Sequence, residues 1–291
     1  MSPLNLVNLT PLMALTTGKF NLKIGVIDGP VATDHPDFND TFFHVLPGNP
    51  PGKCSRNDSI ACSHGTFVVG VLSAQRQSLA PSICPGCPLV IRSIFPEKTV
   101  GNSQIPSADP LTLATAILES IAAGVRIIDL SLDLSPPTVL GEQSLEEALN
   151  YAAQQGVIIV AAAGNQATIG SSVITRHPWV IPVVACDFQG RPTGQSNLAN
   201  SISKRGLSAP GDHIISTGIH GKPRTFSGTS AAAPFVTGAI ALLWSQFPRA
   251  TATQVRFSLT QGYLRRQPSL VPPLLNAWAA YQFMGKEFNL L

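Results

Sequence analysis

The residues best suited to covalent chemistry lie in the segment Ser-Gly-Thr-Ser-Ala-Ala-Ala-Pro at 227–234. Ser230 follows a glycine turn and precedes an apolar run, 231–244, that predicts a helix. This spacing puts its hydroxyl at a helix N-terminus, where backbone N–H groups and the helix dipole favour developing negative charge. Because a serine hydroxyl attacks poorly until a base takes its proton, the rest of the sequence must supply that base and a group that orients it.

Candidates for both groups lie upstream of the serine. The apolar segment 22–28 predicts a buried strand that ends at Asp28, and a Ser-His-Gly-Thr segment carrying His64 opens an apolar run that predicts a buried helix. A second buried strand is predicted at 157–163, and it is followed by Gly-Asn, in which the asparagine is Asn165. A carboxylate, an imidazole and a hydroxyl are the groups needed to orient a base, transfer a proton and attack a carbonyl.

Each of these residues also has an ordinary structural interpretation. Asp28 would end a strand in an Asp-Gly turn, and His64 would be a histidine held by the backbone at a helix start. Asn165 would be a loop asparagine, and Ser230 would be an N-cap. Each interpretation is plausible for one residue alone, but four such coincidences in this order are improbable, so we predict a catalytic site.

The four motifs in this order resemble the subtilisin-type (subtilase) serine peptidases. In that family a strand ending in Asp-Gly carries the aspartate, His-Gly-Thr carries the histidine and Gly-Thr-Ser carries the serine. The resemblance extends over roughly residues 23–280. It implies a catalytic triad of Asp28, His64 and Ser230. It also implies that Asn165 and the backbone N–H of Ser230 stabilise the oxyanion.

The resemblance further implies a substrate groove. The segment Ile-Asp-Leu-Ser-Leu at 128–132 resembles the groove strand of the family, and Asp133 follows where most members have glycine. Two interpretations of Asp133 stay open: its carboxylate narrows the groove or attracts a basic or polar side chain, or it points to solvent. Small residues at 161–164 leave room for a sizeable P1 side chain. The implied groove residues are Ser131, Leu132, Asp133, Ala162, Ala163 and Gly164.

Within the family, the segment Asp-Gly-Pro-Val at 28–31 and the following His-Pro resemble the cyanobactin maturation proteases, which process ribosomally made peptide precursors. Asp37 departs from that group, where cysteine is expected. We find no room near His64 for a large insertion of the kind that shields an acyl-enzyme for macrocyclisation, so we expect hydrolysis. The expected substrate is a peptide or protein, in particular a leader-containing precursor. The alternatives are a general subtilisin-like protease and a degenerate subtilase that acts as a binding module.

Length and composition narrow the remaining function classes. The chain has 291 residues, enough for one large α/β domain. Its charged residues make up 12% and its net charge is +3, and the basic residues are scattered, so nucleic-acid binding is not expected. No stretch approaches ~18 uninterrupted apolar residues, so no membrane span is expected. A secretory signal pattern is also missing, which predicts a cytoplasmic location or a piece cut from a larger chain.

The five cysteines leave three interpretations open. The pairs 54/62 and 84/87 would form two local disulfides, although disulfides are rare in reducing cytoplasm. In the second interpretation these four cysteines are free thiols. In the third they bind zinc together through four thiolates, which the wide 54/62 spacing disfavours. Cys186 follows an apolar run and is expected to be buried.

Metal chemistry is a separate alternative. A metal-dependent hydrolase would need hard ligands close together, as at Asp34, His35, Asp37 and His44. A turn-rich loop explains these residues more simply, and a His-Glu-x-x-His pattern is absent. We therefore expect that catalysis requires no cofactor and assign no metal ligands. Calcium as a structural ion, as in many subtilases, is the option that stays open.

The order of predicted elements indicates the fold class. Continuous apolar strands alternate with helices, which predicts an α/β fold with a mostly parallel sheet and helices on both faces. The resemblance implies that this is the three-layer subtilisin-like fold. Strands are predicted at 22–28, 88–94, 125–132, 157–163 and 180–185. Helices are predicted at 64–74, 109–123, 142–155, 230–245, 252–260 and 275–282. Residues 1–20 are expected to form an N-terminal arm and residues 21–291 the peptidase domain.

Overall fold

The architecture is a parallel sheet between two layers of helices. The computed structural model describes residues 2–56, 58–97, 107–132, 134, 141–262 and 269–287. Seven strands form one sheet in the order β2-β3-β1-β4-β5-β6-β7, and every neighbouring pair is parallel. These strands are β1 (Ile24–Asp28), β2 (Phe43–Val45), β3 (Leu89–Ser93), β4 (Ile127–Leu130), β5 (Ile158–Ala162), β6 (Ile181–Cys186) and β7 (Leu207–Pro210).

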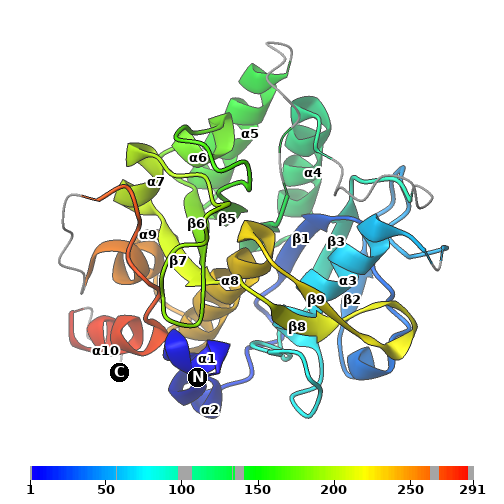
Figure 1. Cartoon of the computed structure of the whole chain (residues 1–291), viewed down its shortest axis with the longest axis horizontal. Helices are drawn as coiled ribbons and strands as arrows, with labels where there is room; N and C mark the ends of the chain where they lie inside the picture. Colours follow the sequence, from blue (N-terminus) through cyan, green and yellow to red (C-terminus); the bar gives the residue numbers. More distant parts are fainter. Residues whose placement is uncertain are drawn as a thin grey trace.

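Helices cover both faces of this sheet (Figure 1). The described helices are α1 (Pro3–Leu6), α2 (Leu9–Leu15), α3 (Ile60–Ser73), α4 (Pro110–Ala122), α5 (Glu142–Gln154), α6 (Val173–Arg176), α7 (Asn200–Arg205), α8 (Thr229–Gln246), α9 (Ala252–Phe257) and α10 (Ala277–Glu287). Short helical turns lie at η1 (Pro36–Phe38), η2 (Ile219–Gly221) and η3 (Ser258–Gly262). Within the described residues, no helix combines the length and apolar character needed to cross a membrane.

The central strands are apolar throughout because both of their faces are covered. In β1, Ile24 and Val26 belong to the core beneath α3 and α8, whereas Ile27 belongs to the core beneath α4 and α5. Neighbouring residues therefore enter opposite cores, as the period of two in a strand requires. This confirms the predicted three-layer α/β fold.

The predicted elements are present, with shifted boundaries. Helix α3 begins at Ile60 because the Ser59 side chain caps it by accepting from the Cys62 N–H at 3.1 Å. His64 therefore lies in the second turn of the helix and not at its start. The helix predicted at 252–260 ends as α9 at Phe257 and continues as a π-helical turn, 258–262.

Several short elements were not predicted. The edge strands β2 and β7 have three and four residues, too few for a hydrophobic period to be recognised. An antiparallel hairpin, β8 (Ile214–Thr217) and β9 (Pro223–Phe226), also escaped prediction. This hairpin leads directly into α8 and so helps to position the site.

The N-terminal segment belongs to the core. Leu9 and Leu12 of α2 are fully buried, and α2 packs against α8 and α10. Helices α1 and α2 consequently lie on the same side of the molecule as α10 (Figure 1). The division between an arm and a domain at residue 20 stays a prediction.

We expect Leu12→Ala to reduce the free energy of unfolding by about 2–5 kcal/mol, because it removes a fully buried side chain beneath α8. Urea denaturation measures this loss. The matched control is Leu15→Ala in the same helix, at a side chain that is 48% exposed, which should change stability by about 0.5 kcal/mol or less. Equal effects of the two substitutions would contradict the assignment of α2 to the core.

Candidate active site

Three side chains that the sequence singled out meet in one line of hydrogen bonds. His64 Nδ1 lies 2.9 Å from both carboxylate oxygens of Asp28, and His64 Nε2 lies 3.0 Å from the Oγ of Ser230. Asp28 and His64 are each 1% exposed and Ser230 is 6% exposed. In this arrangement the imidazole can take the hydroxyl proton while the carboxylate fixes its tautomer and orientation.

A close backbone contact brings His64 to the end of β1. A Cβ atom on Gly65 would lie 2.7 Å from the carbonyl oxygen of Gly29 and 2.6 Å from that of Pro30. A Cβ on Gly29 would overlap the carbonyl group of Ala61. Helix α3 can therefore lie against the turn after β1 only because both positions are glycine.

Ser230 is the second residue of α8, at the helix N-terminus that the sequence predicted. The N-cap residue Gly228 has a φ of 132°, in the region that favours glycine. A Cβ there would also lie 2.9 Å from Asn165 Oδ1. Pro234 within the helix has no N–H to donate to the Ser230 carbonyl four residues earlier.

Asn165 is oriented from one side. Its Oδ1 accepts hydrogen bonds from the backbone N–H of Thr229 at 2.8 Å and from the Thr229 hydroxyl at 3.2 Å. The same hydroxyl accepts from the N–H of Gly164 at 3.2 Å. Because these bonds hold Oδ1, the amide Nδ2 is the group that remains to donate to a substrate oxygen beside Ser230.

The hairpin contributes an aromatic residue that sequence reasoning missed. The Phe226 ring, in β9, packs edge-on against the His64 imidazole at 5.5 Å between ring centroids and against Phe67 at 5.0 Å. It thereby covers one side of the imidazole. The available signal was an aromatic residue two positions before the Gly-Thr-Ser motif.

A cavity of about 590 Å³ adjoins the strand ends near Asn165. Its walls include Leu132, Ala162 and Ala163 of the predicted groove. Ser131 contributes no side chain to it, because its fully buried hydroxyl donates inward to Asp129 at 2.5 Å. The prediction for Asp133 lies outside the described residues.

Asp129 is a buried carboxylate that the sequence analysis did not assign a role. It is fully buried and accepts hydrogen bonds from the hydroxyls of Ser131 and Thr237, both at 2.5 Å. Burial raises its pKa to about 6, although the two hydrogen bonds oppose the rise, and the negative charge of Asp28 contributes to it. The available signal was one acidic residue inside an otherwise apolar strand.

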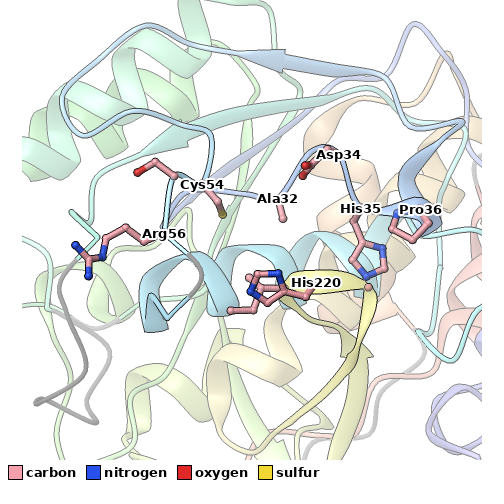
Figure 2. A pocket seen from close by; sticks show the side chains of 10 residues that line it. Ala32, Asp34, His35, Pro36, Cys54, Arg56 and His220 are labelled. Carbon is pink, nitrogen blue, oxygen red and sulfur yellow. The ribbon is translucent and has the colours of Figure 1, made fainter.

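The alternative metal cluster is not assembled. Asp34, His35 and His220 are among the residues that line a cavity of about 350 Å³, and Figure 2 shows how these side chains lie. His35 Nδ1 accepts from the backbone N–H of Asp37 at 3.0 Å, while the exposed His44 lies on β2 and does not line the cavity. Within the described ranges, one set of three potential ligands converges, and it consists of Cys54, Cys62 and Glu97.

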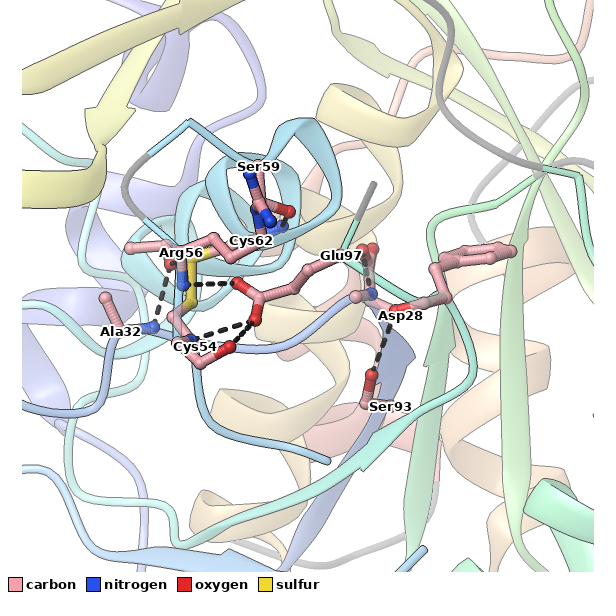
Figure 3. Close-up of a disulfide and its surroundings, with 12 residues drawn as sticks. Asp28, Ala32, Cys54, Arg56, Ser59, Cys62, Ser93 and Glu97 are labelled. Carbon is pink, nitrogen blue, oxygen red and sulfur yellow. Dashed lines mark hydrogen bonds between the residues drawn. A yellow bond between two sulfur atoms is a disulfide. The ribbon is translucent and has the colours of Figure 1, made fainter. Parts of the chain in front are cut away.

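Two of those three ligands are joined to each other. Cys54 and Cys62 form a disulfide, and the neighbouring Glu97 carboxylate accepts from the N–H groups of Ser55 and Arg56 at 2.9 and 3.1 Å (Figure 3). This is one of the two disulfides that the sequence left open, and it contradicts the four-thiolate zinc site.

The remaining cysteines are free thiols. Cys84, Cys87 and Cys186 are buried, as predicted for the last of them. The Cys84 thiol donates a hydrogen bond to the Cys87 sulfur; this bond, together with burial, raises the pKa of Cys84, and it lowers the pKa of Cys87. Burial raises the pKa of Cys186 to about 12. The Cys84 and Cys186 thiols are therefore protonated at neutral pH.

We expect Asp129→Asn to remove a pH-dependent cost to stability. Folding raises the Asp129 pKa from 3.8 to about 6, so ionisation of this group opposes folding. The stability present below pH 4 is lost as the pH rises through 6, by at most about 3 kcal/mol. The unfolding free energy of the variant relative to wild type should therefore increase between pH 4 and pH 7.

Urea denaturation across this pH range measures the difference. Glu147→Gln removes one exposed carboxylate from α5 and serves as the control with the same change in net charge. A difference between Asp129→Asn and wild type that does not vary with pH would contradict the raised pKa.

Comparison with known proteins adds independent evidence. Residues 19–266 match the Subtilase family profile. The chain is 29% identical over 269 residues to Subtilisin E of Bacillus subtilis (strain 168), covering 90% of this chain and 66% of that protein. It is also 29% identical over 269 residues to Subtilisin of Bacillus pumilus, covering 90% of this chain and 91% of that protein.

Solved structures give the same result at the level of the fold. The Prenylagaramide maturation protease PagA superposes with a TM-score of 0.81 at 28% identity, covering 94% of this chain and 98% of that one. The Patellamide maturation protease PatA gives a TM-score of 0.75 at 30% identity, covering 92% and 98%. A lanthipeptide protease, at 19% identity and a TM-score of 0.78, covers 97% of this chain and 93% of its own and shares the fold.

Proposed function

Since the chain belongs to the subtilase family of subtilisin-like serine endopeptidases, we propose that Ser230 is its nucleophile, His64 its general base and Asp28 the group that orients the base. The observation that carries this proposal is the buried relay from the carboxylate through the imidazole to the hydroxyl. A complete relay also argues against a degenerate subtilase that only binds.

The reaction proceeds in two stages. The Ser230 Oγ attacks the peptide carbonyl carbon while His64 Nε2 takes the hydroxyl proton, and the Nδ1–H donates to Asp28. Asn165 Nδ2 and the Ser230 N–H donate to the oxyanion. His64 then gives the proton to the leaving amine, and a water molecule activated by the same imidazole hydrolyses the acyl-enzyme.

The cavity of about 590 Å³ is the proposed site of the P1 side chain. Its apolar part is formed by Leu132 and the two alanines at 162–163. Its wall also carries Arg176, which is paired with Glu142 at 3.3 Å. The volume and mixed lining support a long side chain with a polar end.

Ser230→Ala is expected to lower kcat/KM for peptide hydrolysis by at least about 10⁴, and His64→Ala by a similar factor, because the triad acts as a unit. The double variant should lose little more than either single variant. Fluorophosphonate labelling of wild type, absent in Ser230→Ala, provides a readout independent of substrate. The control Ser203→Ala in α7 should keep full activity and labelling. Substantial hydrolysis by folded Ser230→Ala would contradict this mechanism.

A finer proposal concerns the substrate. The similarity to the maturation proteases PagA and PatA covers more than 90% of both chains in each case, and it supports the cleavage of a leader peptide from a ribosomal precursor. The segment before α3 is short and is tied to the helix by the Cys54–Cys62 disulfide, which supports hydrolysis over cyclisation. The alternative is a general subtilisin-like protease.

Selectivity separates these two alternatives. We expect the enzyme to cut the precursor encoded nearest its gene at one bond, since contacts along an extended strand would select several substrate residues. Casein should be cut slowly in the same assay, with mass spectrometry locating the products. Fast and broad cleavage of casein, without a preferred bond in the precursor, would support the general protease.

Two expectations from the sequence stay predictions. Catalysis without a cofactor, with calcium only as a structural ion, follows from a relay made entirely of side chains. A cytoplasmic location is the second, and the Cys54–Cys62 disulfide weighs against it because disulfides are rare in reducing compartments.

A further inference from the structure

The core holds a second buried carboxylate that the proposed mechanism does not use. Among the residues that the structure describes, Asp28 and Asp129 are the two carboxylates that are at most 1% exposed. They lie on neighbouring parallel strands, and Val26 of β1 is the register partner of Asp129 in β4. Because Asp28 lies two residues beyond Val26, both carboxylates project from the sheet face that α3 and α8 cover.

Asp129 connects two parts of the site. One carboxylate oxygen accepts from the Ser131 hydroxyl, at the start of the predicted groove segment. The other accepts from the hydroxyl of Thr237, which lies seven residues, or about two turns, after Ser230 in α8. One side chain therefore holds the groove strand to the helix that carries the nucleophile.

The charge of Asp129 also reaches the relay. The ionisable groups that interact with it are Asp28 on β1, His64 on α3 and Cys84 in the segment before β3. The charge of Asp28 opposes ionisation of Asp129, and a protonated His64 favours it. By the same attraction, an ionised Asp129 favours the imidazolium form of His64. The charges of the two carboxylates therefore add at the imidazole.

We propose that Asp129 is a positioning residue of the endopeptidase, whose carboxylate holds α8 against the groove strand and whose negative charge makes His64 a stronger base. This inference rests on the proposed function of His64 as the general base. It assigns a role to a residue that touches neither the substrate nor the reacting atoms.

Asp129→Asn tests the proposal because it removes the charge and keeps the shape and an acceptor oxygen. We expect the acid limb of the profile of kcat/KM against pH to shift to lower pH by roughly half to one pH unit, as the loss of a nearby negative charge requires. The plateau should fall several-fold because the base is weaker. Glu147→Gln, with the same charge change at an exposed site, should leave the profile unchanged.

A second readout does not depend on activity. In the Ser230→Ala background, the imidazole of His64 is titrated by NMR with and without Asp129→Asn, and its pKa should fall by the same amount as the acid limb. Failure of the proposed function would appear as persistent activity in Ser230→Ala. Failure of this inference would appear as an unchanged His64 pKa.

A third variant covers the case in which Asp129→Asn does not fold. Thr237→Val keeps the carboxylate but removes one hydrogen bond that stabilises its charge, so Asp129 retains its proton to higher pH. The acid limb and the His64 pKa should move down as well, by a smaller amount. If both stay within about 0.2 pH unit of wild type in every folded variant, Asp129 acts only in packing and the proposal is overturned.

Discussion

The structure of the site depends on keeping a charged carboxylate, Asp28, out of water. A buried ion is costly unless it is hydrogen-bonded and paired, and Asp28 meets this requirement through the N–H of Gly29 at 2.6 Å and the imidazole of His64. The imidazole can reach it only because Gly65 lets α3 touch the turn after β1. The position of α3, and with it the line from Asp28 to Ser230, follows from this one electrostatic requirement.

Much of this arrangement could be predicted because its signals are local. A strand that ends at Asp28 and a helix that starts beside Ser230 can each be recognised from a few neighbouring residues. Parallel strands then bring such ends to one edge of a sheet. The start of α3 was harder to predict, because its N-cap residue, Ser59, lies in a polar segment that resembles a loop. The bonds of Asp129 illustrate what no local pattern contains, since one partner lies 108 residues away in the chain.

The pairing of cysteines was undecidable for a related reason. Whether Cys54 and Cys62 form a disulfide depends on the path of the segment between them. That path is held by contacts such as the hydrogen bond from the Ser55 N–H to the carboxylate of Glu97, which follows β3 in the chain. Phe226 is a similar case. An aromatic residue can be seen in the sequence, but its edge-on contact with His64 requires the hairpin to fold back over α3. In each case the missing information is a long-range distance.

The burial of α8 has a consequence for the way this enzyme can diversify. Every residue of that helix from Thr229 to Ser245 is buried. Most substitutions there therefore destabilise the fold, whatever effect they would have on selectivity. The cavity rim around Gln166 and Thr168 is exposed, so substitutions there do not disturb core packing. Lineages that acquire new substrates, and laboratory libraries that seek them, should therefore accumulate their changes along that rim while the nucleophile helix stays nearly constant.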